Sequence, residues 1–147
     1  MILVDVNLLI HAVFADSQRH VAARVWLDGA LGGEEPVALP WVVLAGFIRI
    51  ATNPRAMTDP LTLEDALARV DEWLALPAVR VVGPTPRHRV EFARMLRGAQ
   101  ATGNLVSDAV LAALAEEHDC TVASTDGDFA RFPGLRWFNP LAPAQAE

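Results

Sequence analysis

Cysteine is almost absent from this sequence. Its 147 residues include a single cysteine, Cys120. One thiol excludes an internal disulfide framework and cannot form a thiolate zinc site by itself. A lone cysteine fits a reducing compartment, so we expect a cytoplasmic protein.

Long hydrophobic runs are also missing. The longest apolar stretch, Val37 to Ile50, is interrupted by a proline, a glycine and an arginine, and it is too short to span a bilayer. At the N-terminus, Met1–Val4 leads directly into Asp5, without the basic and apolar regions of a signal peptide. We therefore expect no signal peptide and no association with membranes.

Lysine is absent, so all 12 basic residues are arginines, and 18 acidic residues bring the net charge to -6. This balance disfavours non-specific binding to nucleic acid, because phosphate contacts supply most of that affinity. Such binding would need a local basic patch or a bridging cation. The segment from Arg80 to Arg97 holds five arginines against one acid, Glu91. Within it, Arg87, Arg94 and Arg97 share a helical face that suits either phosphate contact or an ordinary solvated surface.

Short apolar runs alternate with segments of helical periodicity along the chain. Strands are expected at 2–4, 37–39, 79–82, 121–124 and 136–138. Helices are expected at 8–14, 17–31, 41–51, from 62 onwards, at 86–97 and at 107–118, with Ser17 and Thr62 as N-terminal caps and Glu116 and Glu117 at a solvated helix end. This alternation indicates a parallel sheet covered by helices on both faces. With no repeat or long linker, we predict one α/β domain over residues 1–147.

Three aspartates stand where such a sheet would bind a ligand. Asp5 ends the first strand, Asp126 follows the fourth strand, and Asp108 opens an alanine- and leucine-rich helix. The carboxyl ends of parallel strands meet at one edge of the sheet, so these side chains are expected to converge. Each has a simpler explanation alone: Asp5 as a turn former, Asp108 as a complement to a helix dipole, and Asp126 as a turn residue beside Gly127. Their joint placement favours a functional site.

Converging carboxylates repel one another unless a cation neutralises them. The surrounding segments contain no histidine or cysteine, and sites made only of carboxylates suit hard divalent ions such as Mg²⁺ or Mn²⁺. Such ions activate water and hold a phosphodiester for in-line attack. A bridging metal would also let an acidic protein engage an acidic polymer.

Three motifs carry a resemblance to a known family. They are the opening Met1–Asn7, the segment Asn104–Ala113, and the segment Thr121–Phe132, followed by Leu135–Leu141. In this order and spacing they resemble PIN-domain nucleases, and more narrowly the VapC-type toxins of bacterial type II toxin–antitoxin systems. The resemblance covers nearly the whole chain.

The resemblance implies a PIN-like three-layer α/β/α sandwich with a central parallel sheet and cleavage of RNA that depends on Mg²⁺ or Mn²⁺. It also implies a homodimer and a cognate antitoxin as partners. It places metal binding on Asp5, Asp108 and Asp126, and further catalytic roles on Asn7 and Thr125. A sixth residue, Asp128, matches a position that either assists or caps the following turn.

One position departs from the family pattern. The family usually has a glutamate in the helix after the second strand, where this sequence has Gly46, and no acid lies between Glu35 and Asp59. Loss of a carboxylate should weaken metal binding or alter the number of metals. The leading hypothesis is therefore a toxin endoribonuclease, and the alternative is a catalytically weakened PIN domain that acts by binding RNA or antitoxin.

A third class, an aspartyl phosphotransferase, is disfavoured. That class normally has a second aspartate two residues after the first and a lysine further along the chain. Here Asn7 occupies that second position, and the chain contains no lysine.

Overall fold

The structure, a computed structural model, describes residues 1–143. Its elements, in chain order, are β1 (Ile2–Val4), α1 (Val6–Val13), α2 (His20–Leu31), β2 (Val37–Ala38), α3 (Trp41–Ala51), α4 (Leu63–Leu74), β3 (Val79–Arg80), α5 (His88–Ala99), α6 (Leu105–Glu117), β4 (Thr121–Ala123), the 3-10 helix η1 (Gly127–Arg131) and β5 (Trp137–Phe138).

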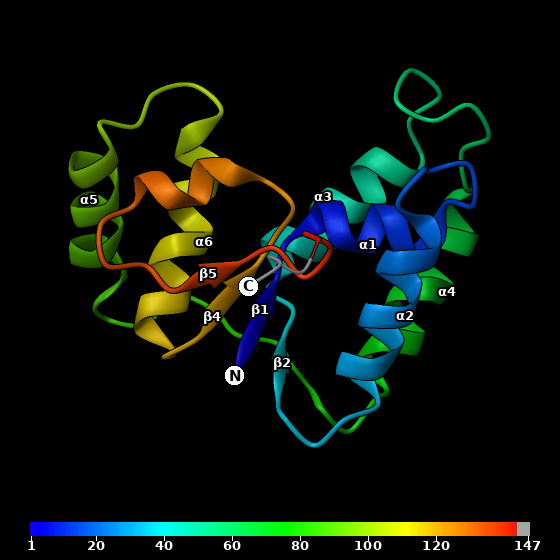
Figure 1. The fold of residues 1–147 in the computed structure, drawn as a ribbon, viewed down its shortest axis with the longest axis horizontal. Helices are drawn as coiled ribbons and strands as arrows, with labels where there is room; N and C mark the ends of the chain where they lie inside the picture. The colour runs from blue at the N-terminus through cyan, green and yellow to red at the C-terminus, as the bar shows by residue number, and fades with distance from the viewer. Residues whose placement is uncertain (144–147) are drawn as a thin grey trace.

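The strands form one sheet in the order β3-β2-β1-β4-β5, and every pairing is parallel. β1 lies at the centre, where Leu3 pairs with Ala38 of β2 on one side and with Val122 of β4 on the other. In Figure 1, α5 and α6 lie on one side of the sheet, and α1, α2 and α4 lie on the other. Helix α3 packs against α1 and α4. This confirms the predicted three-layer α/β/α sandwich.

The apolar strands are buried between the two helical layers. Leu3, Val4, Val122 and Ala123 have no exposed surface. A strand covered on both faces needs apolar residues at consecutive positions, which explains why these runs do not alternate with polar residues. Outside the sheet, the core is extended by Phe47 of α3, which packs edge-on against Trp73 of α4 with ring centroids 4.8 Å apart.

The ends of several helices differ from the sequence prediction. Helix α1 begins at Val6 because the Asp5 side chain caps it by accepting a hydrogen bond from Val6 N at 2.7 Å. The prediction that Ser17 caps the second helix was wrong: α2 begins at His20, and Ser17 Oγ lies 2.7 Å from His11 Nδ1. The prediction for Thr62 is confirmed, since Thr62 Oγ1 accepts from Asp65 N at 3.1 Å.

Two further differences concern the site and the termini of the strands. Helix α6 starts at Leu105, two residues earlier than the predicted Ser107, so that Asp108 lies in its first turn. Strands β2, β3 and β4 end one or two residues earlier than predicted, with β3 covering only Val79–Arg80, and β5 starts one residue later. Within residues 1–143, none of the helices combines the length and the apolar character that crossing a bilayer requires.

Candidate active site

The site lies at the carboxyl ends of β1 and β4. Val4 pairs with Ala123, so the residues that follow these two strands, Asp5 and Ser124, leave the sheet side by side. The sheet order places β2 and β3 on one side of β1 and β4 and β5 on the other. The chain therefore departs from β1 and β4 in opposite directions, which is the arrangement that opens a ligand-binding crevice in parallel α/β sheets.

The Asp5 carboxylate is buried and held by hydrogen bonds. Its Oδ1 accepts from Val6 N, and its Oδ2 accepts from Ser124 Oγ at 2.7 Å and from Asn7 Nδ2 at 3.2 Å. Burial raises the pKa of Asp5, the hydrogen bonds from Ser124 and Val6 oppose that rise, and repulsion by Asp126 adds to it. Asp5 therefore sits in a fixed position as a carboxylate that is costly to ionise.

Asn7 and Thr125 join this network mainly through the Asn7 amide. Asn7 Nδ2 lies 3.1 Å from Ser124 Oγ, and Asn7 Oδ1 accepts from Thr125 N at 3.3 Å. Thr125 thus contributes its backbone N–H, and no hydrogen bond of its hydroxyl occurs within residues 1–143. The amide of Asn7 fixes the loop after β4 relative to the end of β1.

Ser124 is the site residue that the sequence analysis missed. Its side chain is fully buried, and its Oγ contacts Asp5, Asn7 and the backbone N of Asp126 at 3.0 Å. Its position as the first residue after the buried apolar strand β4 was the available signal. Ser124 was overlooked because its hydroxyl gains its role only through contact with Asp5, which is distant in sequence. The neighbouring Thr125 was proposed instead.

The predicted carboxylates divide into two neighbouring groups. Asp108, Asp126 and Asp128 each offer an oxygen, and these three atoms lie within 4.8 Å of one another. Asp126 also caps η1, where its Oδ1 accepts from Asp128 N at 2.9 Å. Asp5 is outside this group, and its oxygens form hydrogen bonds with Ser124, Asn7 and Val6. The structure therefore brings Asp128, expected only as an accessory residue, into contact range with Asp108 and Asp126.

Mutual repulsion links the two groups. Asp108 has a pKa raised to about 6 by its partial burial and, in decreasing order, by the charges of Asp126, Asp5 and Asp128. Three carboxylate oxygens at this spacing form a donor set of the kind that hard divalent cations prefer, and no sulfur or imidazole ligand is present among them. The residues therefore fit the expected cation on both chemistry and charge.

A surface hollow of about 370 Å³ opens beside Asp5 and Asp108. We call it the α3–α6 hollow: it is lined by Val42, Gly46 and Arg49 of α3, by Ser107, Asp108 and Leu111 of α6, and by Asp5 and Val6. Gly46 leaves the α3 side of this hollow without a carboxylate, as its sequence indicated. A Cβ added at Gly46 would meet the Val6 side chain at 3.6 Å, an ordinary contact.

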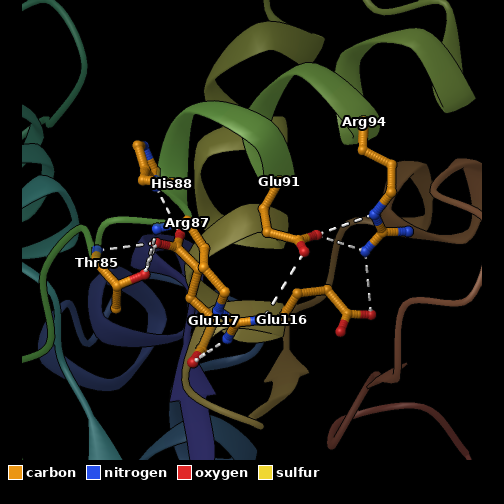
Figure 2. A network of polar contacts seen from close by, with 7 residues as sticks. All are labelled: Thr85, Arg87, His88, Glu91, Arg94, Glu116 and Glu117. Atoms are coloured by element: carbon orange, nitrogen blue, oxygen red, sulfur yellow. Dashed lines mark hydrogen bonds and ion pairs between the residues drawn. The ribbon is translucent and has the colours of Figure 1, made fainter.

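Two side chains of the arginine-rich segment also contact α6. Figure 2 shows that Arg87 and Arg94 face acidic residues of α5 and α6. Arg94 contacts Glu91 at 2.8 Å and Glu116 at 3.7 Å, while Arg87 donates to the Glu117 carbonyl at 2.9 Å. These two side chains link α5 to α6, yet they remain 60% and 49% exposed, and Arg97 is exposed as well. Contact of this face with phosphate therefore stays a prediction.

The expectation that Glu117 ends a helix in solvent was wrong. Its side chain is fully buried, and its carboxylate accepts from Thr85 N at 2.9 Å and from Thr85 Oγ1 at 2.7 Å. His88 Nδ1 lies 2.6 Å from the other oxygen (Figure 2). Burial favours protonation of this carboxyl, but the contacts with His88 and Thr85 outweigh it and lower the pKa.

Comparison with known proteins places the chain in a family. The PIN-domain family model matches residues 2–135. Ribonuclease VapC37 of Mycobacterium tuberculosis is 46% identical over 142 residues, which cover 97% of this chain and 99% of the relative. Ribonuclease VapC43 of the same species is 44% identical over 141 residues, with 96% of each chain covered.

A solved structure gives the same result for the fold. The VapBC2 structure of Rickettsia felis, bound to a DNA fragment from its promoter, has a TM-score of 0.68 at 17% identity, covering 95% of this chain and 98% of the other. Identity this low supports the architecture alone. The sequence relatives, at 46% and 44% identity over almost the entire chain, support membership of the family. The chain belongs to the PIN-domain family, and its full-length relatives there include VapC ribonucleases.

Proposed function

We propose that this protein is an endoribonuclease, the toxin of a type II toxin–antitoxin system, and that it acts as a single PIN domain. The observation that carries the proposal is the cluster of three carboxylates formed by Asp108, Asp126 and Asp128, which lies beside Asp5 at the strand ends. Full-length relatives that are named VapC ribonucleases support the choice of RNA as substrate.

We assign the binding of Mg²⁺ or Mn²⁺ to Asp108 and Asp126, with Asp128 as a further ligand and Asp5 beside them. Bound there, such an ion would supply an activated water and stabilise negative charge on the phosphodiester. The chain's own residues provide the placement: Ser124 and Asn7 hold Asp5, and Asp126 fixes the start of η1. With Asp108 protonated at low pH, the group would lose one of its anionic ligands.

Cleavage of a mixed RNA pool tests the proposal directly. In Mn²⁺ or Mg²⁺ the purified protein is expected to cut the pool, and EDTA is expected to stop the reaction. Asp108→Asn should reduce the rate by about a hundredfold or more, since it removes a charged group that the site needs. Asp71→Asn, on the exposed side of α4, is the matched control and should retain full activity. Equal cutting by Asp108→Asn would overturn the proposal.

Gly46 supports one alternative, a PIN domain with little turnover that acts by binding RNA or antitoxin. The hollow beside Asp5 and Asp108 has no carboxylate from α3. If this alternative holds, the wild type and Asp108→Asn will be equally inactive in the cleavage assay, while RNA or the antitoxin still binds. The same experiment therefore separates the two functions.

The proposed partners are a cognate antitoxin and a second copy of the chain. Val21 and Val25, four residues apart on α2, are 73% and 69% exposed, and Leu63 of α4 is 56% exposed. Apolar side chains this exposed suit a protein interface. Sedimentation at micromolar concentration should show a dimer, and the product of the adjacent reading frame should co-purify with the protein. A monomer at all concentrations would contradict the dimer.

A further inference from the structure

Arg49 is the arginine that lines the α3–α6 hollow. It is exposed, it lies in the last turn of α3, and it lines the α3–α6 hollow together with Asp5 and Asp108. Within residues 1–143, five arginines have a carboxylate within 4.0 Å, and Arg49 is among the seven that do not. Its guanidinium is therefore available beside the acidic group.

The position of Arg49 follows from the periodicity of α3. Val42, Gly46 and Arg49 are separated by four and three residues, so they share one face of the helix, and all three line the hollow. Gly46 has no side chain and adds no charge to the hollow. The glycine thus leaves the arginine as the charged group that α3 presents to the hollow.

The positive charge of Arg49 suits an anionic ligand that extends from the hollow to the carboxylates. An RNA strand is repelled by the net charge of -6 and by the aspartates themselves. A guanidinium offers a planar fork of donors that matches a phosphate, and it remains charged at every physiological pH. The hollow volume of about 370 Å³ lies in the range of ordinary ligand pockets. Val42 and Leu111 add apolar surface for a sugar or base.

We infer that the α3–α6 hollow is a subsite for single-stranded RNA, in which Arg49 binds a backbone phosphate adjacent to the bond that is cut. The inference rests on the proposed ribonuclease function and extends it to a substrate-binding residue outside the acidic group. Arg49 positions the strand across the carboxylates, and its positive charge offsets their repulsion of the substrate.

Arg49 has one other plausible contribution, the stabilisation of α3. A basic residue in the last turn of a helix complements the helix dipole. That role would appear as a loss of thermal stability in Arg49→Ala and would leave RNA affinity unchanged. Phosphate binding would lower RNA affinity and leave the melting temperature nearly unchanged, so the two roles give opposite results.

The test measures binding and cleavage separately. Anisotropy of a fluorescent pool of short single-stranded RNA, in Ca²⁺ and with RNA integrity checked on gels, gives the affinity at several salt concentrations. The variants are Arg49→Ala and Arg49→Lys, and the matched control is Arg89→Ala, which removes another exposed arginine, one that lies on α5. Steady-state cleavage in Mn²⁺ then gives KM and kcat for each protein.

Arg49→Ala should bind RNA about tenfold more weakly and reduce the slope of log affinity against log salt by about 0.7, the change for one phosphate contact with a single strand. Its KM should rise more than its kcat falls. Arg49→Lys should keep most of the salt slope, because it keeps the charge, and Arg89→Ala should keep both affinity and slope.

Two outcomes would overturn the inference, and a third would overturn only the proposed ribonuclease function. Equal effects of Arg49→Ala and Arg89→Ala would overturn it while cleavage by the wild type still supports the ribonuclease. A loss confined to antitoxin binding would assign the hollow to a protein and also overturn it. If no protein cuts RNA but Arg49→Ala alone loses RNA affinity, the subsite stands and the ribonuclease proposal fails.

Discussion

At the scale of single residues, the Ser124 hydroxyl connects the two strand ends that carry the site. It bonds to Asp5 across 119 positions of sequence, and it also accepts from the backbone N of Asp126. A buried carboxylate and a backbone N–H therefore depend on one oxygen. Removing that oxygen leaves both groups less satisfied in a region that water reaches poorly.

We expect Ser124→Ala to lower the free energy of unfolding by about 1–3 kcal/mol and to weaken Mn²⁺ binding about tenfold, because it removes a partner that orients Asp5. Thr125→Ala is the matched control, since its contact with Asn7 is made by the backbone. It should change stability by less than about 0.5 kcal/mol. Urea denaturation and metal titration measure both effects, and equal losses in the two variants would show that Ser124 has no special role.

The pKa of Asp108 makes a second prediction, for the metal-free protein. The folded-state pKa of about 6 is above the ordinary value of 3.8, so the folded protein binds the proton more tightly than the unfolded chain does. Stability therefore falls as pH rises through this window. Above it, Asp108→Asn should be more stable than the wild type by about 1–2 kcal/mol, less than the full shift implies because the group is partly exposed.

Thermal melts in EDTA across this pH range check the prediction. The advantage of Asp108→Asn should shrink as pH falls below the folded pKa of about 6 and disappear below the ordinary value of 3.8, where both forms are neutral. A stability difference that stays constant with pH would mean that the carboxylate is not destabilised by its neighbours. The variant is also the inactive one in the cleavage assay, so stability and activity should change in opposite directions.

At the scale of elements, the packing of α5 on α6 depends on Glu117. Its fully buried carboxylate receives the Thr85 backbone and hydroxyl donors from the segment before α5, and it pairs with His88 in the first turn of α5 (Figure 2). Because α6 also carries Asp108, this anchor at its far end helps to fix the helix whose first turn forms the site.

Glu117→Ala should destabilise the protein by about 2–4 kcal/mol, because it leaves buried donors of Thr85 without an acceptor. Glu116→Ala is the matched control. The Glu116 side chain is 36% exposed and its ion pair with Arg94 is a long one of 3.7 Å, so its loss should cost less than about 0.5 kcal/mol.

The pKa of Glu117 is lowered from 4.5, so the stability that its carboxylate contributes is present above that pH and is lost as pH falls through the folded value. The gap between wild type and Glu117→Ala in urea melts should therefore narrow in acid, and equal effects of the two substitutions would contradict the assignment.

The elements also show which features a sequence can predict. Short runs such as Ile2–Val4 and Thr121–Ala123 are apolar at every position because helices cover both of their faces, and this pattern is visible without a structure. Helix boundaries were less predictable: Ser17 has a capping side chain, but it bonds to Arg19 N and His11 instead. Glu117 was assigned to solvent because its partners, 32 and 29 residues away, are brought near it only by the packing of α5.

The same reasoning applies to the site. Asp5, Asp108 and Asp126 could be proposed as site residues because strand ends and a helix start are recognisable in the sequence, and parallel topology brings them to one edge. Which carboxylates approach closest was not predictable, because it depends on how Asp126 caps η1 and so turns Asp128 toward Asp108. Arg49 was noticed only as an interruption in an apolar run, since its place in the hollow depends on the contact between α3 and α6.

At the scale of the whole molecule, we expect the concentrated acidic charge to make the stability of the fold depend on divalent cations. An ion that binds only the folded protein stabilises it by mass action, about 2.7 kcal/mol when its concentration is a hundred times the dissociation constant. For a chain of this size that corresponds to a rise in Tm of roughly 5–10 °C. Mn²⁺ should produce this rise in the wild type but not in Asp108→Asn, and NaCl of equal ionic strength should not replace it.

Substitutions at Gly46 test whether α3 can contribute to metal binding. In EDTA, Gly46→Ala should raise Tm, because alanine favours a helix by about 1 kcal/mol over glycine and the new Cβ fits beside Val6. Gly46→Glu gains similar helix propensity, but its charge is repelled by Asp5 and Asp108, so it should melt below Gly46→Ala. In Mn²⁺ the order should reverse, because the added carboxylate can share the cation. If Mn²⁺ raises both melting temperatures equally, residue 46 does not reach the metal, and the missing family glutamate has no bearing on metal affinity in this protein.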